Sequence, residues 1–314
     1  MNRPSGAGLR ITFCCSGTEP EPWLQGLRAA LPGAEVSLWQ PGAQQADVAV
    51  VWAPPQAFFD EQSRLQAIFN TGAGVDALLR LRLPDGVPLL RLEDAGMGAQ
   101  MAEYVCHAVI GHYREFSAIA ADVAQGLWRP RMPAPRAQHT VAVLGLGVLG
   151  QRVLRALQAF DFPVRGWSRT PKTLPGVATF AGPDGLRACV QDSAVLVNLL
   201  PLTPETRGLI NRDTLAWLRP GAQVVNVARG AHVVDDDLLA LLDSGHIGHA
   251  ALDVFHTEPL PPDHPYWRHP LVRLTPHTSA RTLRDESIAQ IARNIHAWQR
   301  GEPLSGVVDR DRAY

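Results

Sequence analysis

The glycine pattern in residues 140–150 constrains the fold more than any other feature of this chain. The segment reads Thr140-Val-Ala-Val-Leu-Gly-Leu-Gly-Val-Leu-Gly150, an apolar run that ends in G-x-G-x-x-G and leads into a helical repeat. Each glycine has its own reason: Gly145 permits a tight turn, Gly147 lets the backbone approach a pyrophosphate, and Gly150 lets helix and strand pack closely. A pyrophosphate would meet the free N–H groups where the helix begins. The segment therefore predicts a dinucleotide-binding strand–turn–helix unit.

Short apolar runs alternate with helical patterns along most of the chain, which predicts parallel sheets joined by crossover helices. The first third contains five such runs, at residues 9–15, 34–39, 47–52, 65–70 and 88–92. A second series supplies six, at residues 140–144, 163–167, 194–198, 223–227, 250–255 and 271–275. Six strands are what a full dinucleotide-binding sheet requires.

Two segments between and after these series predict long helices. Residues 96–121 predict a long, mostly unbroken helical stretch, and the proline-rich residues 128–135 after it predict a loop or linker. Residues 282–300 predict an amphipathic helix that begins with a capping box of Thr282 and Asp285. We expect this last helix to return to the first series of strands.

Length and pattern together predict an α/β protein of two domains. The chain has 314 residues, and domains usually run about 100–200 residues. Residues 101–280 are expected to form a Rossmann-type doubly wound parallel sheet. Residues 1–100 and 281–314 are expected to form a smaller, flavodoxin-like α/β domain.

Composition argues against several other classes of protein. The net charge is −1, which gives no global field for nucleic acid or an anionic membrane. No apolar run approaches the roughly 20 residues that span a bilayer, and the start lacks the apolar core of a signal peptide. The four cysteines show no metal-binding spacing, so no metal site is predicted. Reduced thiols and a cytoplasmic location are the expectation.

The segment after residues 163–167 predicts which dinucleotide is bound. An NAD site normally has Asp or Glu at this strand end, to accept hydrogen bonds from the ribose 2′-hydroxyl. This chain has Ser168, Arg169 and Lys172 instead, and Lys172 is the only lysine in the sequence. Such side chains can bind a 2′-phosphate with charge assistance, although a solvated basic turn would read the same way. We therefore predict NADPH as cofactor, with NAD less favoured.

Three further strand ends carry ionisable side chains. Arg229 follows one buried run, Asp253 and Glu258 lie at and beyond the end of the next, and His277 ends a third. In open α/β sheets, ligands bind at the carboxyl ends of the strands. We therefore expect these side chains at the same edge as the glycine loop.

Together these segments resemble the D-2-hydroxyacid dehydrogenase family. Besides G-x-G-x-x-G, the resemblance rests on residues 70–76, Asn198-Leu-Leu-Pro-Leu-Thr-Pro-Glu-Thr-Arg-Gly208, Asn226-Val-Ala-Arg-Gly230, Leu252-Asp-Val-Phe255, Glu258-Pro259 and Thr275-Pro-His277. The residues 167–169, 266–270 and 308–314 are similar to the glyoxylate/hydroxypyruvate reductase A subfamily.

The resemblance implies a catalytic set of Arg229, Glu258 and His277. His277 would give a proton to a substrate carbonyl as hydride arrives from the nicotinamide. An unperturbed histidine has a pKa of about 6.5, and a carboxylate beside it, here Glu258, favours the charged form. Arg229 would hold the substrate carboxylate and polarise the carbonyl.

The resemblance also implies binding residues. Residues 70–76 resemble the family's substrate loop, in which Ala73 and Gly74 can turn N–H groups toward a carboxylate; a simple glycine turn is the alternative. Trp52 either roofs the substrate pocket or belongs to the core. Asp253 is expected to bond the nicotinamide amide. The expected cofactor-lining residues are Gly145, Gly147, Val148, Leu149, Gly150, Pro201, Thr206, Val227 and Ala228.

The implied function is NADPH-dependent reduction of small 2-oxo acids, such as glyoxylate or hydroxypyruvate, by a homodimer. Two rivals share the scaffold: another family member, of the phosphoglycerate or formate dehydrogenase kind, and a non-catalytic nicotinamide-sensing binding protein. After His277 the chain has Thr278-Ser-Ala280 where the family more often has an apolar residue and two alanines. This departure bears on the preferred substrate.

Overall fold

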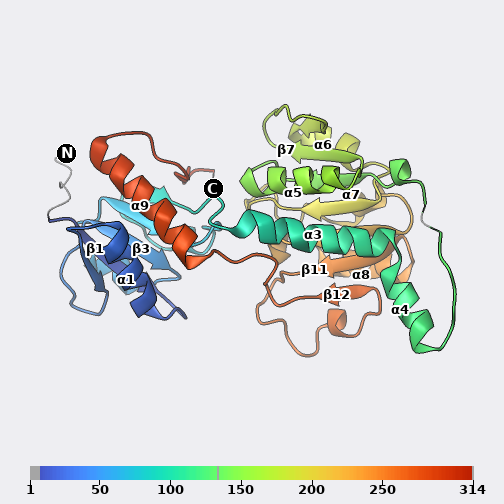
Figure 1. Cartoon of the computed structure of the whole chain (residues 1–314), viewed down its shortest axis with the longest axis horizontal. Coiled ribbons are helices and arrows are strands. Elements are labelled where there is room, and N and C mark those ends of the chain that lie inside the picture. Colours follow the sequence, from blue (N-terminus) through green and yellow to red (C-terminus); the bar gives the residue numbers. More distant parts are fainter. Residues whose placement is uncertain (1–7, 133, 313–314) are drawn as a thin grey trace. The chain divides into compact units, whose positions relative to one another are not determined.

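The structure is a computed structural model that describes residues 8–132 and 134–312. Within the predicted segments, residues 1–7, Pro133 and residues 313–314 lie outside this part. The chain divides into two compact units, Met1–Met97 with Arg281–Tyr314 and Gly98–Ala280 (Figure 1). In the part of the chain that the structure describes, no helix has the length and apolar character to cross a membrane.

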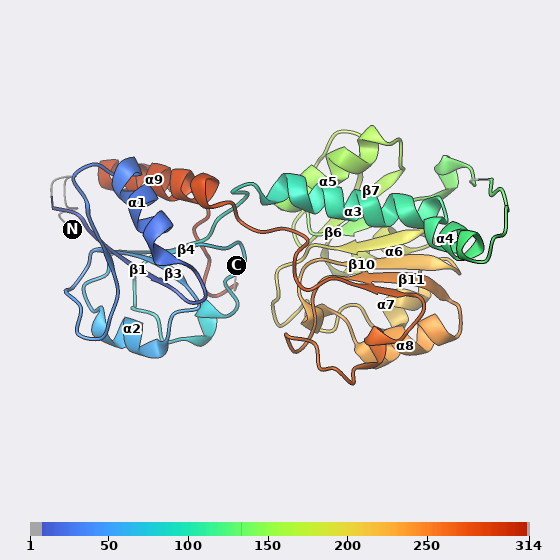
Figure 2. The same cartoon turned by 60° about the horizontal axis from the view of Figure 1, so that its bottom comes forward.

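Unit 1 is built on a five-stranded parallel sheet in the order β2-β1-β3-β4-β5. Its strands are β1 (Arg10–Cys15), β2 (Glu35–Leu38), β3 (Val48–Trp52), β4 (Ala67–Asn70) and β5 (Leu89–Leu90). Figure 2 shows α1 (Pro20–Ala30) and α9 (Arg284–Arg300) on one face and α2 (Gln56–Glu61) on the other. The helix from the end of the chain thus packs onto the first series of strands, as predicted.

The start of α9 differs from the prediction. Leu283 is its N-cap and makes no side-chain capping bond, so the predicted box of Thr282 and Asp285 is wrong. The Thr282 hydroxyl instead donates to the carbonyl oxygen of Thr71, 3.0 Å away. The Thr282 hydroxyl is therefore engaged by an acceptor far away in the sequence and does not cap the helix.

Unit 2 is built on a seven-stranded parallel sheet in the order β12-β11-β10-β9-β6-β7-β8. Its strands are β6 (Val141–Leu144), β7 (Val164–Ser168), β8 (Ala178–Ala181), β9 (Val195–Asn198), β10 (Ala222–Asn226), β11 (Ile247–Leu252) and β12 (Val272–Leu274). The order reverses between β6 and β9, which is the doubly wound arrangement of a Rossmann sheet. The predicted fold class is confirmed.

Helices cover both faces of this sheet. One face carries α3 (Met97–Tyr113) and α5 (Val148–Ala159), and the other carries α6 (Gly182–Val190), α7 (Arg212–Ala216) and α8 (Asp235–Asp243) (Figure 2). All four residues of the central strand β6 are apolar because both of its faces are buried. Val141 and Val143 pack into the core on one face, and Ala142 and Leu144 into the core on the other. Strands buried on both faces read as continuous apolar runs.

Two details of unit 2 depart from the prediction. The sheet has a further strand, β8, whose residues are exposed or half-buried and give no apolar run. The mostly unbroken helical stretch predicted over residues 96–121 consists of two helices, α3 and α4 (Phe116–Ala124), because the backbone of Glu115 adopts a left-handed conformation with φ 55°. Helices do not continue through such a residue.

Candidate active site

The glycine loop between β6 and α5 has the shape that the sequence predicts. A Cβ on Gly150 would lie 1.8 Å from the Gly145 carbonyl oxygen, and a Cβ on Gly145 would lie 2.7 Å from that of Leu199. These two glycines are therefore required by packing. A Cβ on Gly147 would meet nothing within 4 Å, so the loop is open at the one position where a phosphate has to approach. The helix begins directly after Gly147, with its first N–H groups unpaired within the helix. The loop therefore fits a dinucleotide pyrophosphate.

The basic segment after β7 lies beside this loop. The Lys172 ammonium donates to the Leu146 carbonyl oxygen at 2.7 Å, inside the glycine loop. The Ser168 hydroxyl is buried and donates to Thr170, while Arg169 is exposed. Hydrogen bonding, first from Thr203, holds the pKa of Glu205 below its ordinary value, and the charge of Arg169 adds to this. The basic segment thus faces both the glycine loop and the segment after β9.

Two buried asparagines at the ends of β9 and β10 were not predicted as site residues. The Asn198 side-chain amide donates to the Asn226 side-chain oxygen at 3.0 Å, and the Asn226 amide donates to the Arg229 carbonyl oxygen at 2.9 Å. The Asn198 side-chain oxygen accepts from the backbone N–H of Leu200. The pair therefore ties together the loops that follow two neighbouring strands. The sequence signal that could have predicted them is a polar residue at the end of an apolar run.

Gly230 fixes the position of Arg229. A Cβ on Gly230 would lie 2.0 Å from the carbonyl carbon of Phe255 and 2.4 Å from the backbone nitrogen of His256. The backbone after β10 therefore packs directly on the segment after β11, which carries Glu258. Arg229 is half-buried, and its guanidinium donates to the carbonyl oxygen of Ala228 at 2.7 Å.

The Asp253 side chain, fully buried at the end of β11, holds the segment that contains His277. One carboxylate oxygen accepts from the Thr275 hydroxyl at 2.6 Å and the Thr278 N–H at 2.8 Å. The other accepts from the Ser279 N–H at 2.9 Å. Because the Thr275 hydroxyl donates to a carboxylate, it accepts the 2.7 Å hydrogen bond from the Tyr104 hydroxyl on α3. The predicted nicotinamide contact of Asp253 remains a prediction.

The His277 imidazole and the Glu258 carboxylate meet. Nδ1 of His277 lies 2.7 Å from Oε2 of Glu258, and both side chains are partly exposed. The other oxygen of Glu258 accepts from the Phe255 N–H at 2.9 Å, which orients the carboxylate. The His277 backbone has a left-handed φ of 52°, and its N–H donates to the carbonyl oxygen of Asp253. The residue before it is Pro276, which follows the end of β12 at Leu274 by two residues.

Of the predicted substrate residues, Trp52, Ala73 and Gly74 lie in unit 1, and Arg229 lies in unit 2. The Asn70 side-chain amide donates to the carbonyl oxygens of Gly72 and Gly74, at 3.0 and 2.9 Å. The indole of Trp52 lies directly over Gly72, where a Cβ would come within 2.3 Å of the ring. Trp52 is 40% exposed, so it covers the loop and is no core residue.

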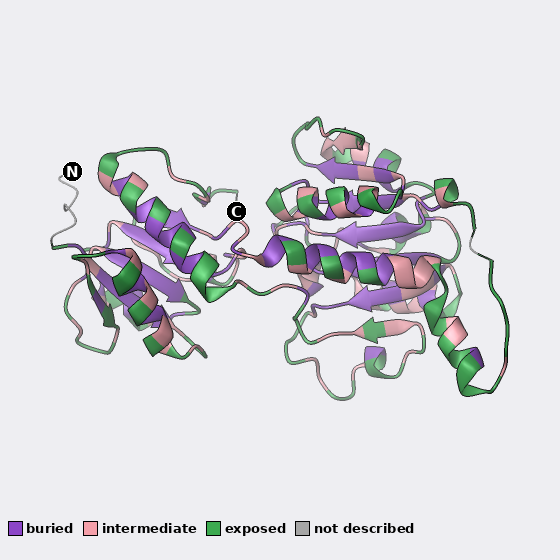
Figure 3. Cartoon of the chain, in the orientation of Figure 1, coloured by how far each residue is buried: buried purple, intermediate pink, exposed green. Residues whose placement is uncertain are grey.

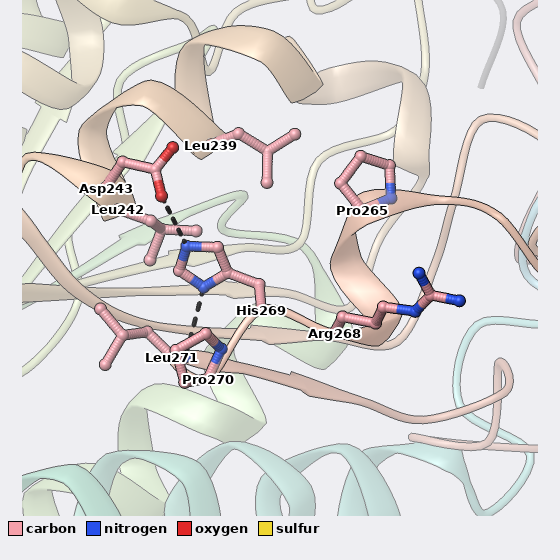
Figure 4. Close-up of a pocket in the computed structure, with 8 residues that line it drawn as sticks. All are labelled: Leu239, Leu242, Asp243, Pro265, Arg268, His269, Pro270 and Leu271. Carbon is pink, nitrogen blue, oxygen red and sulfur yellow. Dashed lines mark hydrogen bonds and ion pairs between the residues drawn. The ribbon is translucent and has the colours of Figure 1, made fainter.

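A hollow of about 680 Å³ lies elsewhere on unit 2, between α8 and the start of β12 (Figure 4). It is lined largely by leucines and prolines, and Nε2 of His269 lies 3.3 Å from Oδ1 of Asp243 at its wall. None of the predicted site residues lines it. Its residues lie on α8 and before β12, away from the carboxyl ends of the strands.

The fold and the strand-end residues place the chain in the class of nicotinamide-dependent dehydrogenases. Residues 106–279 match the family model of the D-isomer specific 2-hydroxyacid dehydrogenase NAD binding domain. Glyoxylate/hydroxypyruvate reductase A of Serratia proteamaculans is 48% identical over 308 residues, which cover 96% of this chain and 98% of that protein. The chain belongs to the D-2-hydroxyacid dehydrogenase family.

Two solved structures are similar over nearly the whole chain. A D-isomer specific 2-hydroxyacid dehydrogenase from Xanthobacter autotrophicus, in complex with NADPH and MES, is 39% identical with a TM-score of 0.93. The alignment covers 97% of this chain and 99% of that one. An NADPH-dependent glyoxylate/hydroxypyruvate reductase from Sinorhizobium meliloti, in complex with NADP and sulfate, is 35% identical with a TM-score of 0.90, covering 98% and 100%.

Proposed function

We propose that this chain reduces glyoxylate and hydroxypyruvate to the corresponding 2-hydroxy acids with NADPH. The observation that carries the proposal is the 2.7 Å contact of His277 with Glu258, at the same sheet edge as the open glycine loop. Relatives of this chain are named for the same substrates and cofactor. The runner-up is a nicotinamide-sensing binding protein without turnover.

The proposed chemistry assigns one task to each residue of the catalytic set. The bound nicotinamide would supply hydride to the carbonyl carbon of the substrate. His277 donates a proton from Nε2 to the carbonyl oxygen, since Nδ1 is engaged by Glu258. Glu258 orients the ring and interacts favourably with its positive charge. Arg229 binds the substrate carboxylate through its planar donor fork.

The loop of residues 70–76 is proposed to bind the substrate carboxylate. A planar peptide directs its N–H opposite to its C=O. Because Asn70 holds the Gly72 carbonyl, the N–H of Ala73 points away from Asn70. In the described residues, no acceptor faces the N–H groups of Ala73 and Gly74. This supports a nest for an anion, with Trp52 as its apolar wall. Unit 1 would then be the substrate domain and unit 2 the dinucleotide-binding domain.

The preference for NADPH is proposed to come from Ser168, Arg169 and Lys172. No carboxylate stands at the end of β7, and the Lys172 ammonium lies at the glycine loop. A 2′-phosphate gains charge-assisted hydrogen bonds from such side chains, which a 2′-hydroxyl cannot match. The pyrophosphate would lie over Gly145, Gly147, Val148, Leu149 and Gly150, and Pro201, Thr206, Val227 and Ala228 would line the rest.

The test is a panel of 2-oxo acids followed by NADPH absorbance and repeated with NADH. We expect turnover of glyoxylate and hydroxypyruvate and at least tenfold higher kcat/KM with NADPH. Arg169→Glu should remove most of that preference, whereas Arg155→Glu, an exposed arginine on α5, is the matched control. Preference for NADH would overturn the cofactor assignment. Binding of NADPH without turnover of any acid would favour the sensing protein.

A homodimer and a cytoplasmic location are also proposed. After α3, residues 116–132 include many exposed positions, drawn green in Figure 3. Large apolar side chains are among them: Trp128 is 94% and Met132 is 88% exposed. Arg131 pairs with Asp122 and Glu115, which orders the segment. An exposed apolar segment of this kind is typical of an interface. Sedimentation of the wild-type protein and of Trp128→Ser would test the dimer.

A further inference from the structure

His232 is a fully buried histidine that the proposed chemistry does not use. It ends the short helix η3 (Gly230–His232), and its side chain is 0% exposed. Each ring nitrogen faces a backbone carbonyl oxygen. Nδ1 lies 3.1 Å from the oxygen of Arg229, and Nε2 lies 3.2 Å from the oxygen of Pro201.

The two carbonyl groups belong to two different parts of the proposed site. Arg229 follows β10 and is the proposed carboxylate-binding residue, and Pro201 follows β9 in the proposed cofactor-lining segment. Each oxygen also accepts a hydrogen bond from its own side of the site. The Asn226 amide donates to the Arg229 oxygen at 2.9 Å, and the Thr206 hydroxyl donates to the Pro201 oxygen at 2.8 Å.

The imidazole therefore adds a further side-chain link between two loops that the Asn198–Asn226 pair and the backbone hydrogen bond from Ile210 to His232 also join. The two lone pairs of the Pro201 oxygen accommodate the Thr206 hydroxyl and the ring. The Arg229 oxygen has the ring, the Asn226 amide and, at the longer distance of 3.3 Å, the His232 backbone N–H as donors. A carbonyl oxygen only accepts, so the ring can act on either loop only as a donor. A neutral imidazole has one N–H and donates to one of the two oxygens, whereas the protonated ring donates to both. A movement of the cofactor-lining segment thereby reaches the backbone of Arg229 through one rigid ring.

We propose that His232 is a positioning residue that couples cofactor binding to the placement of the Arg229 guanidinium. The inference rests on the proposed function for the identity of the two ligands. In the coupled site, NADPH and a substrate carboxylate each bind more tightly when the other is present. A histidine that only fills the core would contribute to stability without such coupling.

Two half-replacements separate the two contacts. In His232→Asn the side-chain amide nitrogen stands near the place of Nδ1, so the contact with Arg229 is kept and that with Pro201 is lost. In His232→Gln the amide nitrogen stands near the place of Nε2, so the contact with Pro201 is kept. His232→Leu removes both contacts.

Binding is measured by NADPH fluorescence, with and without oxalate as an unreactive dicarboxylate, alongside steady-state kinetics with glyoxylate. The Asn variant should raise the Kd of NADPH about fivefold with little change in the KM of glyoxylate, and the Gln variant should do the reverse. In all three variants, oxalate and NADPH should no longer tighten each other's binding.

His246→Asn is the matched control, since Nε2 of His246 also meets a carbonyl oxygen, that of Leu215 at 3.1 Å, but outside the proposed site. It should leave both Kd values within twofold. Equal effects of the Asn and Gln variants on one parameter, or intact coupling in the Leu variant, would overturn the inference. A thermal melt of each variant separates coupling from loss of folding. Absence of turnover by the wild-type protein would refute the proposed function alone, because the coupling is read from binding.

Discussion

The two edges of the seven-stranded sheet both bury polar side chains, but they satisfy them differently. At the carboxyl edge, both polar atoms of the Asn198, Asn226 and Asp253 side chains have hydrogen-bond partners. At the amino edge, His139 precedes β6, and Gln223 of β10 lies beside His249 of β11. There, Nε2 of His139 and the Gln223 side-chain oxygen are buried with no partner among the described residues.

Burial also lowers the pKa values of the histidines at the amino edge. Burial lowers the pKa of His112 to about 4, of His139 to about 3 and of His249 to about 4. After burial, the positive charge of a neighbouring arginine contributes to these lowered pKa values, Arg219 at His112 and His139 and Arg273 at His249. The His112 ring centroid lies 5.8 Å from that of His139 and 6.2 Å from that of His249. The cluster is therefore neutral in the folded protein near pH 7.

The contrast shows that a buried polar cluster does not by itself mark a functional site. At the carboxyl edge, the hydrogen bonds fix loops that hold exposed groups, the His277 imidazole above all. At the amino edge, Nδ1 of His139 lies 3.2 Å from the half-buried Arg219 guanidinium, and the Gln223 amide donates to the carbonyl oxygen of Ala108. The hydrogen bonds there hold none of the proposed catalytic or binding residues. The difference that matters is whether the network ends on a side chain that a ligand can reach.

The largest expected difference between the two edges is in turnover. His277→Ala should lower kcat roughly 10²–10⁴-fold, because general acid catalysis typically contributes that much. His249→Ala, at the amino edge, should leave kcat of the folded enzyme within about twofold, because it lies far along the strand from the site. Both are measured with NADPH and glyoxylate. Near-normal turnover by His277→Ala would remove the proton-donor role.

A smaller loss is expected from Asp253→Asn, which keeps the size of the side chain but replaces one acceptor by a donor. The new amide group would face the Ser279 or Thr278 N–H, so one hydrogen bond to the His277 segment is lost. We expect kcat to fall about 10-fold or more, since truncating a buried charged partner costs on the order of 2 kcal/mol. Substitution of Asp243, whose carboxylate meets His269 at the hollow, is the control. Equal kcat in both variants would contradict the positioning role of Asp253.

The fold could be predicted from the sequence more completely than the contacts of the candidate site. Central strands such as β6 are buried on both faces, so each is an apolar run that any reading detects. The edge strand β8 has no such apolar run. The interruption between α3 and α4 falls at Glu115, where no glycine or proline indicates the end of a helix. Thr282 has the right spacing for a cap, but its acceptor is Thr71, 211 residues away.

Motifs at strand ends predicted which residues gather, but not what holds them. The contact between His277 and Glu258 spans 19 residues and follows from parallel strands ending at one edge. The supporting contacts do not follow from any spacing. Asn198 meets Asn226 across 28 residues, and His232 meets Pro201 across 31, and only the packed sheet brings them together. A single sequence therefore indicates the candidate reacting groups through their chemistry, but not the residues that hold them in place.

The smallest expected effect is on the stability of the protein in acid. It tests the buried histidines at the amino edge of the sheet. The folded-state pKa values of the three histidines lie below the ordinary 6.5, so below pH 6.5 the unfolded chain binds more protons than the folded one. The free energy of unfolding is therefore highest above pH 6.5 and falls as the pH drops toward 4. Each histidine contributes on the order of 1 kcal/mol or more to this loss.

His249→Asn isolates one member of the cluster, because its side-chain oxygen can still accept from the Gln223 amide as Nδ1 does at 3.2 Å. The variant cannot take up a proton there. Its urea midpoint should therefore fall less between pH 7.5 and pH 5 than the wild-type midpoint does. His246→Asn controls for the loss of a histidine outside the cluster and should keep the wild-type difference. If His249→Asn keeps the full wild-type difference too, the burial of this ring does not govern the acid sensitivity, and the two edges differ in hydrogen bonding alone.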